Sequence, residues 1–220
     1  FSPAANRAFR GFCRKKYKTI AALNAAWHTA YANFNEIKVP CADERAEKYV
    51  NDERADNIAA GAISVRARDY YECYNEAYAR AADYFCGKIK RLYAGDIFVG
   101  CFSGYVAQLD RRLGHCAFSR LLKSENVDFF ASPFAYSNSR APAIDWAYHA
   151  PMESAKRAGK LWFLEADVRT SLTIPLTKAA PRLFLRGRAE EAKRAYETNP
   201  VWTGPDEENS KYNILRSFAK

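Results

Sequence analysis

The residues best suited to chemistry stand together after a single apolar run. Residues 161–164 are all apolar or aromatic and lead directly into Glu165, which Asp167, Arg169 and Thr170 closely follow. A guanidinium near a carboxylate holds that carboxylate ionised, so Arg169 suits Glu165 as a partner. Asp167 and Thr170 can in turn orient Arg169. This group is a candidate for catalysis, and the alternative is an acid–base network that only caps the end of a strand.

The element that positions Glu165 is a predicted strand. A short apolar run that begins just after Gly159 is typical of a buried parallel strand, and Glu165 then occupies its carboxyl end. In α/β barrels the carboxyl ends of the strands form the catalytic face. Alternation of side chains places Phe163 and Glu165, with Leu161, toward a barrel interior and turns Trp162 toward the helices, with Leu164.

Helical and strand patterns alternate along the chain at a spacing of about 30 residues, as in successive βα units. Helices are predicted from residue 3 through 17, at 20–27, from about 69 to 94, and at 115–123, 151–158, 187–198 and 206–220. Strands are predicted at 97–102, 127–131 and 161–165. Three strands cannot close a barrel of eight. No glycine-rich nucleotide loop follows any strand, so a nucleotide-binding fold lacks its usual motif.

Aromatic residues follow two of these strands. Tyr105 leaves the strand at 97–102, Tyr136 leaves the strand at 127–131, and Trp146 lies in the long loop after the latter. A tyrosine at a strand end can donate a hydrogen bond to a carboxylate or stack on the ring of a bound ligand. Ordinary packing in the core is the alternative that the sequence leaves open. Trp146 can supply a flat binding surface in the same way. A stripe of tyrosines and aliphatic residues at helical spacing between residues 70 and 92 predicts core packing.

Composition excludes several classes of function. The net charge is +9, but the basic residues form only small clusters on predicted helix exteriors, and no nucleic-acid-binding motif accompanies them. We therefore expect no nucleic-acid partner. No apolar run approaches the roughly 20 residues of a membrane span, so no membrane association is expected. The only methionine is Met152, and we accordingly expect that Phe1 is not the native start.

The six cysteines predict buried thiols, with Cys13, Cys86 and Cys101 in apolar patterns. No Cys-x-x-Cys pair occurs, and only three histidines are present, so no metal site is expected. Unpaired thiols favour a reducing compartment. The location of the protein therefore stays open, with the cytoplasm favoured.

Four segments in order resemble the beta-galactosidase-like glycoside hydrolases of family 42 and its relatives. The first combines Ala8-Phe9-Arg10 with Leu23-Asn24-Ala25-Ala26-Trp27, and is similar to the run that follows barrel strand four in the family. The others, at residues 99–105, 121–136 and 159–170, are similar to strands five, six and seven with their exits. One departure is Lys18, which stands where the family has glycine.

The resemblance implies an α/β fold, namely a partial TIM (β/α)8 barrel that covers about strands 5 to 7. Residues 1–220 would form the C-terminal part of the catalytic domain, as a fragment. It also implies a retaining glycosidase, in which two carboxyl groups about 5–5.5 Å apart act on β-linked galactosides. Glu165 is then the nucleophile, and the acid/base glutamate ends strand four, before Phe1.

The same resemblance gives the remaining residues their roles. Arg169, Asp167, Tyr105, Tyr136 and Trp146 are expected to bind the carbohydrate substrate, and no cofactor is implied. Whether the protein forms a homo-oligomer is left open by the sequence. The alternative function is a catalytically inactive barrel module that binds carbohydrate or a protein partner, which would have the same pattern in these residues.

Overall fold

The computed structural model describes residues 2–46, 65–103, 113–133 and 150–166, together with the single residues 148, 172, 211, 214 and 215. The chain divides into two compact units. Residues 1–130 and 150–162 form the first unit, and residues 131–149 and 163–220 form the second. The helices and the core described below belong to the first unit.

Two capped helices begin the chain. Helix α1 (Pro3–Tyr17) starts where the Ser2 hydroxyl accepts the Ala5 backbone N–H at 3.2 Å, with proline in the first turn. Helix α2 (Ile20–Trp27) starts in the same way, because the Thr19 hydroxyl accepts the Ala22 N–H at 3.2 Å. Both helices were predicted from these capping residues, and both predictions are confirmed.

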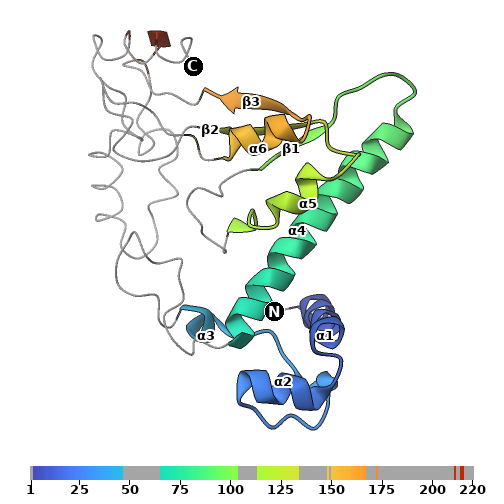
Figure 1. Ribbon diagram of the computed structural model, residues 1–220, viewed down its shortest axis with the longest axis vertical. Coiled ribbons are helices and arrows are strands. Elements are labelled where there is room, and N and C mark those ends of the chain that lie inside the picture. Colours follow the sequence, from blue (N-terminus) through green and yellow to red (C-terminus); the bar gives the residue numbers. More distant parts are fainter. Residues whose placement is uncertain are drawn as a thin grey trace. The chain divides into compact units, whose positions relative to one another are not determined.

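A long helix follows these two. After the short helices η1 (Phe34–Glu36) and α3 (Ala42–Ala46), helix α4 (Val65–Leu92) is the longest element of Figure 1. It begins before Asp69, the predicted start. Its N-terminal half joins α1 and α2 in one apolar cluster, formed by Phe9, Cys13, Leu23, Trp27, Ile37, Val39 and Cys73.

Three short strands form a parallel sheet in the order β1-β2-β3. They are β1 (Gly100–Phe102), β2 (Phe129–Pro133) and β3 (Leu161–Glu165), and they are connected through α5 (Phe118–Leu122) and α6 (Met152–Arg157). The prediction for β3 is confirmed. The first two strands begin later than predicted, since regular pairing starts only after Val99 and Asp128, where the Asp128 N–H donates to the Val99 carbonyl at 2.7 Å.

One face of the sheet packs against helices. Phe130 lies against Phe118 of α5, with 4.6 Å between ring centroids, and Trp162 packs on the same cluster from β3. The buried members of this core are Ala79, Cys86, Val99, Phe118, Leu121, Val127, Phe130 and Ala155. Trp162 therefore faces the helix layer, as its position in the alternation predicted.

The other face of the sheet is exposed. The alternate positions along and beside β1 and β3 carry Phe98, Phe102, Leu161 and Phe163, which are 72%, 43%, 47% and 51% exposed. A strand buried on both sides was predicted here, and that part of the prediction is wrong for the described chain. Parallel strands normally have both faces covered, whereas this face presents exposed apolar side chains.

The stripe of α4 differs from its prediction in a similar way. Its predicted core members Phe85, Ile89 and Leu92 are 61%, 47% and 73% exposed. The buried face of this helix passes instead through Tyr71 and Cys86, with Ala79 between them. The helical spacing correctly predicted an apolar stripe on α4, but that stripe is not the face of the helix that packs in the core.

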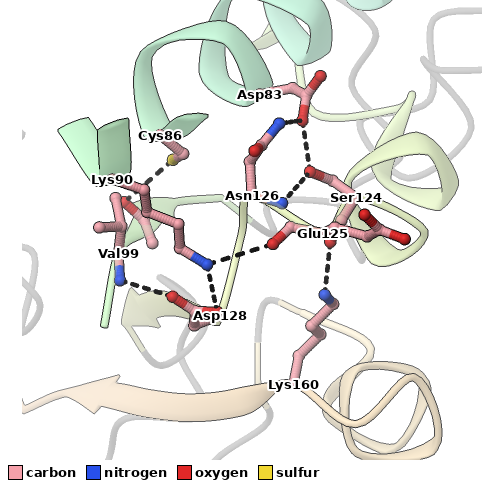
Figure 2. A network of polar contacts seen from close by, with 10 residues as sticks. Asp83, Cys86, Lys90, Val99, Ser124, Glu125, Asn126, Asp128 and Lys160 are labelled. Carbon is pink, nitrogen blue, oxygen red and sulfur yellow. Dashed lines mark hydrogen bonds and ion pairs between the residues drawn. The ribbon is translucent and has the colours of Figure 1, made fainter. Parts of the chain in front are cut away.

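At the amino ends of the strands, a polar network holds α4, the strands and the loop at 124–126 together (Figure 2). The Asp128 carboxylate accepts the Val99 N–H at 2.9 Å and the Lys90 ammonium at 2.7 Å. Lys160, which precedes β3, donates to the Ser124 carbonyl. The pKa of Asp128 lies below its usual value: burial alone would raise it, but Lys90 and the Val99 N–H outweigh burial. The polar side chains at this end of the sheet therefore stabilise the fold.

The fold is thus a mixed arrangement of helices around a small parallel sheet, which is an α/β arrangement as expected. The closed or partial barrel remains an inference from the sequence. The predicted helices at 187–198 and 206–220 lie outside the described residues, apart from helical positions at 211, 214 and 215.

Candidate active site

Glu165 lies where the sequence places it. It is the last residue of β3, and its side chain is exposed. Since catalytic groups of parallel α/β folds cluster at the carboxyl ends of strands, this is the position at which a reactive carboxylate is expected. Its placement is confirmed, while its role stays a prediction.

The strand that carries Glu165 is fixed at its start. A turn at Gly159, with φ of +70°, leads from α6 into the strand, and this left-handed conformation favours glycine. The Lys160 N–H then donates to the Ala155 carbonyl at 3.0 Å, and the Leu161 N–H donates to the Asp128 carbonyl at 2.9 Å. These bonds anchor the strand, so a carboxylate at its far end extends from an ordered element.

The other predicted site residues lie outside the described part of the chain. These residues are Tyr105, Tyr136, Trp146, Asp167 and Arg169. Their expected roles in binding carbohydrate stay predictions.

A serine–histidine pair at the end of β1 was not predicted. Ser103 directly follows β1 and is 1% exposed, and its Oγ lies 3.2 Å from Nδ1 of His115. Burial lowers the pKa of His115, which favours the neutral imidazole. Tyr78 packs edge-on against the ring, with 5.1 Å between centroids. A structural role suits this pair, because the serine is buried and a nucleophile must be accessible.

A second carboxylate, Asp69, is buried and fully engaged. It is 1% exposed, and it accepts hydrogen bonds from Lys16 at 2.9 Å, Tyr17 at 2.5 Å and Trp27 at 2.8 Å. Burial, followed by the bond to Asp69, raises the pKa of Tyr17 to about 12. Three donors from α1 and α2 leave Asp69 no room for a substrate. It ties the first two helices to α4 and is no candidate for acid–base catalysis.

The shielded cysteines behave as inert thiols, whereas Cys41 and Cys116 are exposed, and for these two the prediction of buried thiols is wrong. All six are free, and Cys13, Cys73 and Cys86 are buried, as the apolar pattern predicted for the first and third of them. Burial raises the pKa of Cys13 and of Cys101 to about 12, so neither ionises near neutral pH.

Among the described residues, no group of three or more histidine, cysteine or acidic side chains is arranged to hold a metal ion. No described helix combines the length and the apolar character needed to cross a bilayer.

Comparison with known proteins supports the resemblance at the N-terminal end. Residues 1–54 match the family model Glyco_hydro_42, described as Beta-galactosidase. A stretch of 45 residues is 44% identical to the beta-galactosidase BgaA of a Thermus species, and it covers 18% of this chain and 7% of that protein. No solved structure matches the chain.

These matches confirm the similarity to family 42 beta-galactosidases, as a partial match. The family model covers the first of the four resembling segments, the one that forms α1, α2 and the loop after them. The relative is far longer than the matched stretch, so its activity does not transfer directly to this chain. For the segments around β1, β2 and β3, the resemblance to the family rests on their sequence motifs alone.

Proposed function

We propose that this chain is part of the catalytic domain of a beta-galactosidase-like glycoside hydrolase. The observation that carries the proposal is the match of residues 1–54 to the Beta-galactosidase family model. The position of Glu165 at the carboxyl end of a parallel strand supports it independently, since that position suits a catalytic carboxylate. Substrates of the protein would be β-linked galactosides or similar glycosides.

The proposed reaction is a double displacement. Glu165 attacks the anomeric carbon and forms a glycosyl-enzyme, while a second carboxyl group protonates the leaving oxygen. The same second group then removes a proton from water, which releases the sugar with its configuration retained. In this proposal the second group is a glutamate that ends barrel strand four, upstream of the family-like segment at α1 and α2.

The partial barrel belongs to the same proposal. The order of β1, β2 and β3 in a parallel sheet suits strands five, six and seven. The apolar side chains on the open sheet face suit the interior of a barrel, where layers of large side chains meet. Asp167, Arg169, Tyr105, Tyr136 and Trp146 would line the substrate site above it.

The test uses the protein that contains this chain and a chromogenic β-galactoside. Glu165→Gln removes the proposed nucleophile with little change in shape, and we expect turnover to fall by about 10³-fold or more. Glu153→Gln is the matched control, because Glu153 is an exposed glutamate that forms an ion pair with Lys156 on the same helix. Its activity should remain near that of the unmodified protein.

Two results would reject the proposal. Turnover by a folded Glu165→Gln variant at the level of the control would remove Glu165 from the mechanism. A protein that binds galactosides but shows no turnover at all would support the inactive carbohydrate-binding module instead.

A further inference from the structure

A groove on the helical side of the first unit has the properties of a binding site. It lies between α1, α4 and α5 and has a volume of about 600 Å³. Pockets of about 300–1,000 Å³ are typical of small-molecule sites. None of the residues proposed above for glycoside hydrolysis lines it, so the inference does not depend on the proposed function.

The charges along this groove are unequal. Four cationic side chains line it, Lys15, Lys16, Arg80 and Arg120, against the two carboxylates of Glu72 and Glu76. Both carboxylates are already paired. Lys16 contacts Glu72 at 2.5 Å, and Arg120 contacts Glu76 at 2.8 Å.

The remaining two cations come from different helices. Lys15 belongs to α1 and Arg80 to α4, and both are exposed. Neither takes part in a hydrogen bond or an ion pair with any other described residue. Two uncommitted positive charges therefore line one groove, and no uncommitted carboxylate accompanies them there.

The groove also has an apolar part. Phe12 is half-buried in it, and Gly11 leaves open space, since a Cβ at that position would meet nothing within 4 Å. A ligand can therefore place an anionic group between the two cations and rest its uncharged body against Phe12. The space beside Gly11 accommodates that body.

We propose that this groove binds a small phosphate monoester. A guanidinium presents a planar fork that matches the oxygens of phosphate, and Arg80 is the uncommitted guanidinium of the groove. A phosphate monoester carries about −1.5 to −2 charges at pH 7, which matches the two uncommitted positive charges of the groove. A single carboxylate carries only one negative charge and matches them less well. The ester group occupies the space over Phe12.

The experiment measures binding to the full chain by calorimetry. The probes are glucose 6-phosphate, inorganic phosphate and uncharged glucose, all at the same low ionic strength. We expect saturable binding of glucose 6-phosphate, weaker binding of inorganic phosphate and none of glucose. Arg80→Gln and Lys15→Gln should each weaken binding of glucose 6-phosphate by about tenfold.

Two matched controls remove the same charge from the same helices. Arg68→Gln lies on α4 and Arg7→Gln lies on α1, and neither residue lines the groove. Their affinities should stay within about twofold of the unmodified chain. A third variant, Gly11→Glu, adds a carboxylate to the groove and should abolish binding, while a better helix former at this exposed position keeps the helix stable.

Several results would overturn the proposal. Absence of saturable binding of glucose 6-phosphate would do so, as would equal losses in the groove variants and the controls, because these would indicate attraction by net charge alone. Unchanged binding in Gly11→Glu would place the ligand elsewhere. Circular dichroism of each variant confirms that a loss of binding is not a loss of fold.

Discussion

At the scale of single residues, Asp69 and Glu165 differ in burial. Asp69 is buried and accepts three hydrogen bonds from two other helices, whereas Glu165 is an exposed residue at a strand end. A buried carboxylate that accepts three hydrogen bonds contributes to folding, because removing its charge leaves its donors poorly satisfied. Glu165 has the exposure that a reacting group requires.

Asp69→Asn should therefore destabilise the chain. The substitution keeps the shape but removes the charge that binds Lys16 and places an amide against the Tyr17 and Trp27 donors. We expect a loss of about 2–3 kcal/mol in the free energy of unfolding, measured with urea. Glu72→Gln, which affects the exposed partner of the same lysine, should cost less than about 1 kcal/mol. Equal costs for the two variants would contradict this interpretation.

The Asp128 carboxylate makes the stability depend on pH. Its folded pKa lies below the ordinary value of 3.8, so the unfolded chain takes up its proton first as the pH falls. Its contribution is fully present above that value and is lost as the pH falls through the folded pKa. In Asp128→Asn, urea unfolding between pH 5 and about pH 3 should show a weaker dependence on pH. A pH dependence identical to that of the unmodified chain would remove Asp128 as a cause.

At the scale of elements, the sequence predicts local structure well where capping groups define it. Ser2 and Thr19 marked the starts of α1 and α2, and the run that ends in Glu165 marked β3. These signals lie within a few residues of the structure that they determine. The buried face of α4 was not predicted, because it depends on which distant elements pack against the helix.

The candidate site was predicted to the same limited extent. Glu165 was identified because its strand has a local pattern. The contact between Ser103 and His115 joins the end of one strand to the residues before α5, and nothing in the spacing of the two residues indicated it. Contacts between separate elements require tertiary packing, which local patterns do not encode.

Substitutions at two glycines test how closely α1 and β1 pack against their neighbours. A Cβ at Gly11 of α1 meets nothing, whereas a Cβ at Gly100 of β1 would collide with the carbonyl oxygen and the ring of Phe129. Gly11→Ala should stabilise the chain by about 0.5–1 kcal/mol through helix propensity. Gly100→Ala should destabilise it by about 2 kcal/mol or more, since backbone must move. Thermal or urea unfolding of both variants decides the point, and a tolerated Gly100→Ala would show that β1 and β2 are not so closely packed.

At the scale of the whole molecule, the open face of the sheet exposes apolar side chains among the described residues. Phe98, Phe102, Leu161 and Phe163 are all exposed there. Exposed apolar patches of this kind promote association. The proposed barrel would cover these side chains with its remaining strands.

The isolated chain should therefore associate as its concentration rises, and it should lack hydrolase activity. Phe163→Ser should shift sedimentation profiles toward the monomer, because it removes apolar area from the open face. Tyr84→Ser, at an exposed aromatic on α4, is the control and should change association less. A chain that stays monomeric at high concentration would argue against association through the open face, and an active monomer would contradict the partial barrel.

The central claim is that Glu165 forms a covalent bond to the sugar. The most direct measurement treats the protein that contains this chain with an activated 2-deoxy-2-fluoro-β-galactoside, which slows breakdown of the glycosyl-enzyme, and maps the label by peptide mass spectrometry. We expect one labelled peptide, with the sugar on Glu165 and labelling prevented by excess galactose. A label on another carboxylate, or an active enzyme that releases its sugar with inverted configuration and takes up no label, would contradict it.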